Sequence, residues 1–74
     1  MSSKQIGLTI KKFREERKLS QEVLSGLAGI DRSHLSKLEL GIRSPTLNVL
    51  YKLAEAMDVR GSEILLAAEK QEEC

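Results

Sequence analysis

The sequence predicts an all-α fold, a compact bundle of five helices. Apolar residues recur at helical spacing along the whole chain, and glycines and a Ser-Pro pair divide it into five segments. None of these segments alternates apolar and polar residues as a half-buried strand would. With 74 residues, the chain is expected to form one domain over 1–74. A chain of this size buries only ~60% of the surface that its unfolded form exposes, so a partner subunit would help to stabilise it.

The first helix is expected over about residues 3–17, where Ile6, Ile10 and Phe13 repeat at helical spacing. The same end of the chain is basic. Residues 1–20 contain six Lys and Arg and two Glu, a net charge of +4, whereas the last six residues contain three Glu and one Lys. The whole-chain charge of +1 therefore conceals an asymmetry that affects what the surface presents.

Residues 21–40 are typical of two short helices joined by a tight turn. Ser20 is a candidate N-cap for the first of them, and Gly29 is placed where a left-handed residue ends a helix. The next helix is expected to open at Asp31 or Arg32 and to close at Gly41. Two helices joined in this way form a helix-turn-helix, whose second helix can enter the major groove of DNA. The residues expected to face inward are Leu24, Leu27, Ala28, Leu35 and Leu38.

The fourth and fifth helices are expected within about residues 46–69 and should supply core and dimerisation surface. Thr46 follows a Ser-Pro break and can cap a helix that runs to about Met57. The last helix should run from Ser62 to about Glu69. This region carries more apolar surface than one short helix can hide on one face. The residues assigned to a two-fold interface are Leu47, Leu50, Val59, Ile64, Leu65 and Leu66.

The outer face of the third helix has the chemistry of a DNA reader. If Leu35 and Leu38 face inward, the residues that face outward are Arg32, Ser33, Ser36 and Lys37. Arg and Lys can donate to guanine O6 and N7, and Ser hydroxyls can bind bases or phosphates. Gln21 stands at a helix N-terminus, where its side chain and the free backbone N–H groups favour a phosphate.

The sequence closely resembles the Cro/repressor-type (XRE-type) helix-turn-helix proteins, with a lambda-repressor-like domain. The segments that carry the resemblance are Ser20-Gln21-Glu22-x-Leu24, Leu27-Ala28-Gly29-Ile30 and Ser33-His34-Leu35-Ser36-Lys37-Leu38-Glu39-x-Gly41-x-Arg43-x-Pro45. Flanking helices extend it to about residues 6–66. The run Leu-Ala-Gly-Ile-Asp-Arg-Ser-His-Leu-Ser is most similar to small restriction–modification controller proteins.

This resemblance implies a usually dimeric transcriptional regulator that binds a near-palindromic operator. It places base contacts on Arg32, Ser33, Ser36 and Lys37. It places phosphate contacts on Gln21, Arg43 and Asn48. It also implies a structural ion pair between Arg14 and Glu39, since an acid on a DNA-reading helix is better explained as a brace.

The expected function is sequence-specific transcriptional regulation by a homodimer on double-stranded DNA, with control of its own promoter or of a restriction–modification operon. RNA polymerase is a further possible partner. The alternative is an antitoxin-type protein whose DNA-binding domain also binds a toxin; the short tail after residue 66 argues against it. No enzymatic activity is expected, because one His, one Cys and one Tyr leave few groups for catalysis or metal binding. We expect no cofactor, metal ion or small-molecule ligand.

A cytoplasmic location is expected. A lone Cys cannot form an intramolecular disulfide, the N-terminus does not resemble a secretory signal, and no apolar run approaches the ~20 residues of a membrane span. Cys74 is interpreted as part of an inert tail rather than a redox sensor. His34 is interpreted as a partly packed residue without a switching role.

Overall fold

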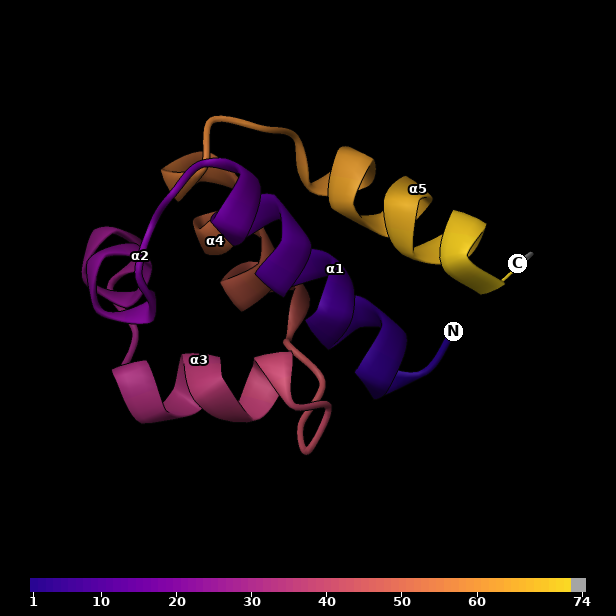
Figure 1. Ribbon diagram of the computed structural model, residues 1–74, viewed down its shortest axis with the longest axis horizontal. Helices are drawn as coiled ribbons and strands as arrows, with labels where there is room; N and C mark the ends of the chain where they lie inside the picture. The colour runs from indigo at the N-terminus through magenta and orange to yellow at the C-terminus, as the bar shows by residue number, and fades with distance from the viewer. Residues whose placement is uncertain (73–74) are drawn as a thin grey trace.

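The computed structural model describes residues 1–72, which form five α-helices around one core (Figure 1). No strand occurs in these residues, so the predicted all-α bundle is confirmed. The predicted helix ends differ from the observed ones by up to three residues, within or near the usual uncertainty at frayed helix ends. The helices are α1 (Ser3–Glu16), α2 (Gln21–Ala28), α3 (Arg32–Glu39), α4 (Leu47–Ala56) and α5 (Gly61–Glu72).

Helix α1 lies between α3 and α5 and packs on both of them (Figure 1). Helix α2 packs on α3 and α4, and α4 also packs on α5. The molecule measures 32 × 24 × 22 Å. Because α3 contacts the bundle through α1 and α2, the opposite face of this helix remains open to solvent.

Side-chain caps fix where three of the helices begin. Ser2 and Gln5 form a capping box at α1, in which each side chain bonds the other residue's backbone N–H. The hydroxyl of Ser20 accepts from the N–H of Val23 at 3.0 Å, as expected for the N-cap of α2. Thr46 caps α4 in the same way. These caps satisfy N–H groups that have no partner within the helix.

The core is aliphatic and draws on every helix. The large aliphatic side chains that are fully buried are Ile10, Leu24, Leu35, Leu38, Leu53 and Ile64. Leu27 does not join them, and the expectation that it faces inward was wrong. Leu24, Ser25 and Ala28 form the buried face of α2, and Leu27 lies about 100° around the helix from the centre of that face. Its side chain is therefore exposed.

Helices α1 and α3 approach closely at Gly7, which is buried against the end of α3. A Cβ atom added at Gly7 would overlap the carbonyl oxygen of Leu38 and lie 2.9 Å from that of Glu39. Only a residue without a side chain fits between the two helices at this point. The contact sets how near α1 comes to the C-terminal end of α3.

Candidate nucleic-acid interface

Helices α2 and α3 form a helix-turn-helix unit around Gly29. This residue has φ +71°, the left-handed conformation expected at this position, and ends α2. The N–H of Ile30 then donates to the carbonyl of Ser25 at 3.0 Å, which closes the turn. Asp31 precedes the first residue of α3 and makes no side-chain capping bond. The tight turn sets α3 across the end of α2.

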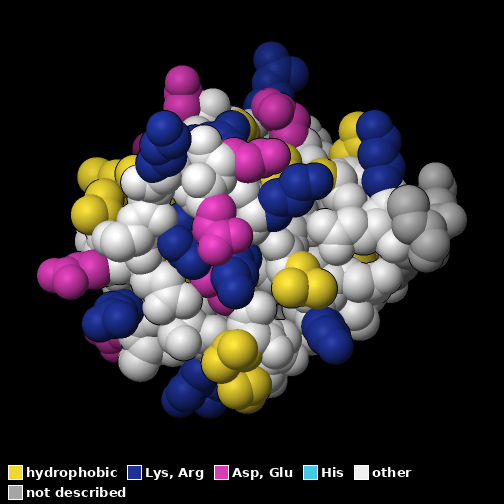
Figure 2. Space-filling view, in the orientation of Figure 1, with side chains coloured by type: hydrophobic (Ala, Val, Ile, Leu, Met, Phe, Trp, Pro, Cys, Tyr) yellow, Lys and Arg dark blue, Asp and Glu magenta, His cyan; other side chains and the backbone are white. Residues whose placement is uncertain are grey.

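The two faces of α3 differ in chemistry. Leu35, Leu38 and Glu39 are buried, whereas Arg32, Ser33 and Lys37 are exposed and Ser36 is half-buried. Dark blue side chains project from the edge of the molecule where α3 and the following turn lie, at the bottom of Figure 2. A yellow hydrophobic group lies beside them, whereas dark blue and magenta side chains are interspersed along the upper edge of the same view. The edge at α3 therefore presents donors and positive charge to solvent.

The structure brings most of the predicted DNA-contact residues together around two neighbouring recesses. The first, of about 280 Å³, is lined by Gln21, Arg32, Ser33 and Ser36. The second, of about 250 Å³, is lined by Asp31, Ser33, His34, Lys37 and Arg43. Asn48 is exposed at the second residue of α4 and lines neither recess.

Two residues of this surface were not assigned to it from sequence. Asp31 and His34 line the second recess beside Lys37 and Arg43. The available signal was the i, i+3 spacing that leads from Asp31 to His34 and from His34 to Lys37. Asp31 brings a carboxylate to this recess. Its charge offsets part of the positive charge that this recess presents.

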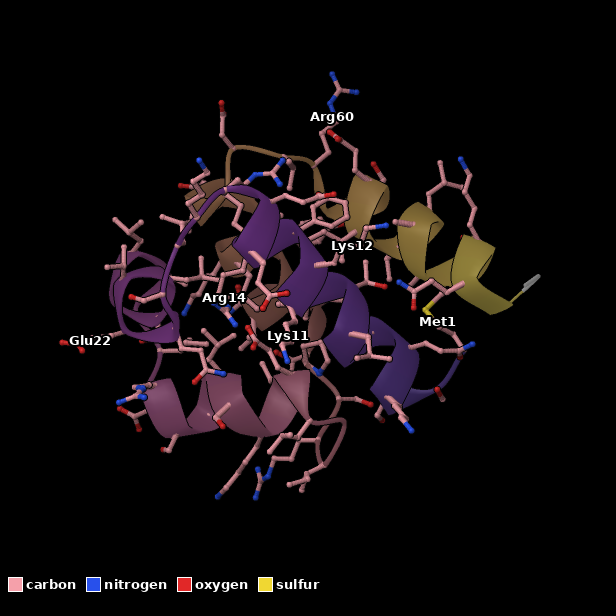
Figure 3. All side chains as sticks on the ribbon, viewed as in Figure 1. Met1, Lys11, Lys12, Arg14, Glu22 and Arg60 are labelled. Carbon is pink, nitrogen blue, oxygen red and sulfur yellow. The ribbon has the colours of Figure 1, made fainter. Side chains whose placement is uncertain are left out.

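Behind this surface, Arg14 and Glu39 form a buried, bidentate ion pair between α1 and α3. Arg14 Nε lies 2.7 Å from Glu39 Oε2, and Arg14 Nη2 lies 3.0 Å from Oε1. A third nitrogen, Nη1, donates to the carbonyl of Leu19 at 2.7 Å. Figure 3 shows Arg14 running from α1 toward α2 and α3. The hydrogen bond to Glu39 raises the pKa of the Arg14 guanidinium above its ordinary value, although burial opposes this.

Gln21 joins the same network from the start of α2. Its amide Nε2 donates to Glu39 Oε1 at 2.9 Å, so Glu39 accepts from two helices at one oxygen atom. Glu39 is only 4% exposed, and the described residues contain no buried side-chain nitrogen or oxygen without a hydrogen-bond partner. Three helices thus meet through one carboxylate directly behind the first recess.

Two of the residues assigned to a dimer interface were wrongly placed there. Leu50 is 2% exposed and Ile64 is fully buried, because both fill the core between α1, α4 and α5. A side chain inside the monomer cannot contact a second copy. Of the others, Leu47 is 65% exposed, Leu66 is also exposed, and Val59 and Leu65 are half-buried against the core.

Tyr51 is a large exposed residue of α4 that was not among those assigned to the dimer interface. It follows Leu47 by one helical turn and lines a recess of about 410 Å³ together with Val59 and Gly61. Its ring packs over Gly61, where an added Cβ would overlap it. The i, i+4 spacing of Leu47 and Tyr51 on α4 is the sequence signal for this exposed face.

Neither a metal centre nor a membrane span is found in residues 1–72. No group of three or more His, Cys, Asp or Glu side chains in this range could hold a metal ion. No helix in it is long and apolar enough to cross a bilayer. Cys74 lies outside the described residues.

Comparison with known proteins identifies the family. A helix-turn-helix family model (HTH_3) matches residues 10–64. An uncharacterized HTH-type transcriptional regulator, y4dJ, of Sinorhizobium fredii (strain NBRC 101917 / NGR234) is 37% identical over 62 residues, which cover 84% of this chain and 80% of that protein. The chain spans only 28% and 50% of two further curated relatives.

Solved structures of similar sequence share the fold. The restriction–modification controller protein C.AhdI from Aeromonas hydrophila superposes with a TM-score of 0.82 and 35% identity, over 84% of this chain and 94% of that one. The biofilm regulator SinR, solved in complex with DNA, superposes with a TM-score of 0.77 and 33% identity, over 81% of this chain and 97% of that one. The chain therefore belongs to the helix-turn-helix (HTH_3, XRE-type) family of DNA-binding transcriptional regulators.

Proposed function

We propose that this regulator binds a palindromic operator as a homodimer and inserts α3 of each subunit into the major groove. The observation that carries the proposal is the recess lined by Gln21, Arg32, Ser33 and Ser36, with Lys37 and Arg43 in the adjoining one. A reading helix needs base-directed donors on one face and phosphate ligands beside them. The family is one of DNA-binding regulators, which are generally not enzymes, and we propose no catalytic activity.

In this arrangement, Arg32 and Lys37 donate to base edges, and Ser33 and Ser36 donate to bases or nearby phosphates. Gln21 and the start of α2 hold a backbone phosphate. The hydroxyl of Ser20 accepts from the N–H of Val23, and its carbonyl accepts from the N–H of Leu24. The first two N–H groups of α2 are then available to such an anion. Arg43 and Asn48 are proposed to contact phosphates on either side.

Selection from random DNA should yield an inverted repeat. The centres of its two half-sites should lie one helical turn of DNA apart, about 34 Å, or a whole number of such turns. The selected duplex should bind at least ~10³ times more tightly than scrambled DNA at the same salt concentration. Fluorescence anisotropy titrations at two salt concentrations provide the measurement. If no sequence is enriched, and if added salt weakens binding to every sequence by the same factor, the chain is not a sequence-specific DNA reader. The next experiment is then co-purification of a toxin partner.

Three single substitutions should separate the proposed contacts. Lys37→Ala should relax base preference at one position per half-site, with a loss of about 1–3 kcal/mol on the selected sequence. Gln21→Ala should weaken binding to every sequence by a similar factor. Arg43→Ala should also weaken binding to every sequence. In addition, it should reduce the magnitude of the negative slope of log K against log salt by about 0.9, because Arg43 carries a charge. Gln21→Ala should leave this slope unchanged, because Gln is uncharged. Equal sequence dependence in all three variants would contradict these roles.

We propose that the second subunit covers the outer face of α4, where Leu47 and Tyr51 are exposed one helical turn apart and Val59 lines a recess with Tyr51. Leu65, half-buried on α5, is proposed to belong to the same interface. Leu66 is also proposed to contribute, from the exposed side of α5. An apolar face of this kind gains stability when a second copy covers it, which matters in a small domain. Two reading helices held rigidly on one dimer match the symmetry of an inverted repeat.

Leu47→Glu should convert the dimer to a folded monomer. A Glu in the first turn of α4 is favoured by the helix dipole, so loss of association would not reflect loss of the fold. Sedimentation equilibrium should show dimer for the unmodified chain and monomer for the variant. The melting temperature should rise with concentration only in the former. Leu27→Glu, an exposed Leu on α2, serves as the matched control and should remain dimeric.

The similarity to C.AhdI supports the further proposal that the operator lies in the chain's own promoter or in that of a restriction–modification operon. A reporter driven by the DNA upstream of its coding sequence should respond to the level of the protein, and Lys37→Ala should shift this response to higher protein levels. An unresponsive reporter would remove this proposal and leave operator binding untouched. Contact with RNA polymerase stays a prediction.

A further inference from the structure

The side chain of Gln21 is held from behind by a buried carboxylate. Glu39 Oε1 accepts from Gln21 Nε2 at 2.9 Å and from Arg14 Nη2 at 3.0 Å, while Oε2 accepts from Arg14 Nε at 2.7 Å. Glu39 is buried and Gln21 is half-buried, so the bond between them reaches from the core to the edge of the first recess.

The chemistry of Glu39 decides which end of the Gln21 amide faces inward. An ionised carboxylate only accepts hydrogen bonds, so it binds the NH₂ end of the amide and repels the carbonyl end. The NH₂ group carries two hydrogens, and one bond to Glu39 leaves the second for an outside acceptor. Without the carboxylate, the amide would be free to rotate about its last side-chain bonds.

We propose that Glu39 is a positioning residue for DNA binding, which fixes the amide nitrogen of Gln21 so that its second N–H meets a phosphate at the start of α2. This inference rests on the proposed contact between Gln21 and the DNA backbone. Glu39 itself does not touch DNA. It acts through Gln21, and Arg14 neutralises the carboxylate so that no unpaired negative charge lies behind the bound phosphate.

A positioning role differs from a purely structural brace in what survives when the ion pair is replaced. Exchange of a buried ion pair for apolar residues of similar volume is often tolerated by a fold. The variant Arg14→Met/Glu39→Met therefore removes the acceptor of Gln21 and keeps the packing between α1 and α3. A brace predicts unchanged DNA affinity in this variant, whereas positioning predicts a loss.

The experiment is a cycle of three variants: Gln21→Met, Arg14→Met/Glu39→Met, and the triple variant. Each is titrated with the selected operator below its melting temperature. We expect Gln21→Met to bind about ten-fold more weakly, as for loss of one hydrogen bond to a charged group. We expect Arg14→Met/Glu39→Met to lose a similar factor, and the triple variant to lose no more than either. The salt slope should stay unchanged throughout, since Gln is uncharged.

Other outcomes overturn separate claims. If Gln21→Met weakens binding but Arg14→Met/Glu39→Met binds normally, Glu39 is only a brace and the phosphate contact stands. If the triple variant loses affinity by the product of the two factors found for Gln21→Met and for Arg14→Met/Glu39→Met, Glu39 does not act through Gln21. If Gln21→Met binds normally, the phosphate contact itself is wrong, and the positioning role is lost with it.

A second measurement uses the unmodified chain and does not depend on how the variants fold. The two side-chain amide hydrogens of Gln21 give separate NMR signals in ¹⁵N-labelled protein. On titration with operator DNA, we expect one signal to shift while the hydrogen bonded to Glu39 keeps its position. If the signal of the hydrogen bonded to Glu39 moves toward the chemical shift of a free amide, DNA breaks that bond, and the proposal is overturned.

Discussion

Arg14→Ala should destabilise the fold by about 3–5 kcal/mol, the cost of removing one partner of a buried ion pair. The substitution leaves the Glu39 carboxylate, which is 4% exposed, without its bidentate partner. It also removes the donor to the carbonyl of Leu19. Since small domains are stable by only about 5–15 kcal/mol, a large part of the folding free energy would be lost.

Thermal unfolding followed by circular dichroism measures this loss. A decrease of at least about 12 °C in melting temperature is expected for a domain of this size. Lys11→Ala, at an exposed position of the same helix, should change the free energy of unfolding by less than about 0.5 kcal/mol. If Arg14→Ala melts at the same temperature as the unmodified chain, the ion pair does not stabilise the fold.

Gly7→Ala should destabilise the fold by about 3 kcal/mol, although Ala is the better helix former. The added Cβ would meet the carbonyl groups of Leu38 and Glu39, which are backbone atoms and cannot turn aside as a flexible side chain could. Relief therefore requires α1 and α3 to move apart, which opens the core around Ile10 and Leu35. The ion pair between these two helices would be strained by the same movement.

Gly26→Ala provides the matched comparison, because Gly26 also lies within a helix. A Cβ added there meets nothing within 4 Å, so the expected effect is a gain of roughly 0.5–1 kcal/mol from helix propensity. The two variants should therefore shift the melting temperature in opposite directions. Shifts of the same sign would show that the close contact at Gly7 does not limit the packing of α1 on α3.

Local signals made most of the fold predictable. The caps at Ser20 and Thr46, the left-handed Gly29 and the spacing of Leu35 and Leu38 each depend on a few neighbouring residues, and all are present as expected. Periodicity shows that a residue faces apolar surroundings, but it does not show whether these belong to the same chain. Leu50 was for this reason assigned to a dimer interface although it fills the monomer core.

The features that the sequence did not reveal depend on how distant segments meet. The bond from Gln21 to Glu39 joins residues 18 apart. The same carboxylate is bound by Arg14, which lies on a third helix. The close approach at Gly7 is likewise a property of two helices, and a Gly inside a helix gives no sign of which neighbour requires it. Whether the outer residues of α3 contact bases stays a prediction.

The division of α3 into a buried and an exposed face has a consequence for how such regulators diverge. Arg32, Ser33 and Lys37 are exposed and lie outside the core, so their replacement should change the free energy of unfolding by less than about 0.5 kcal/mol each. If they read the operator, a lineage can drift to a new target sequence through a few tolerated replacements. Two duplicated copies in one cell could then cease to cross-regulate while both keep the same architecture.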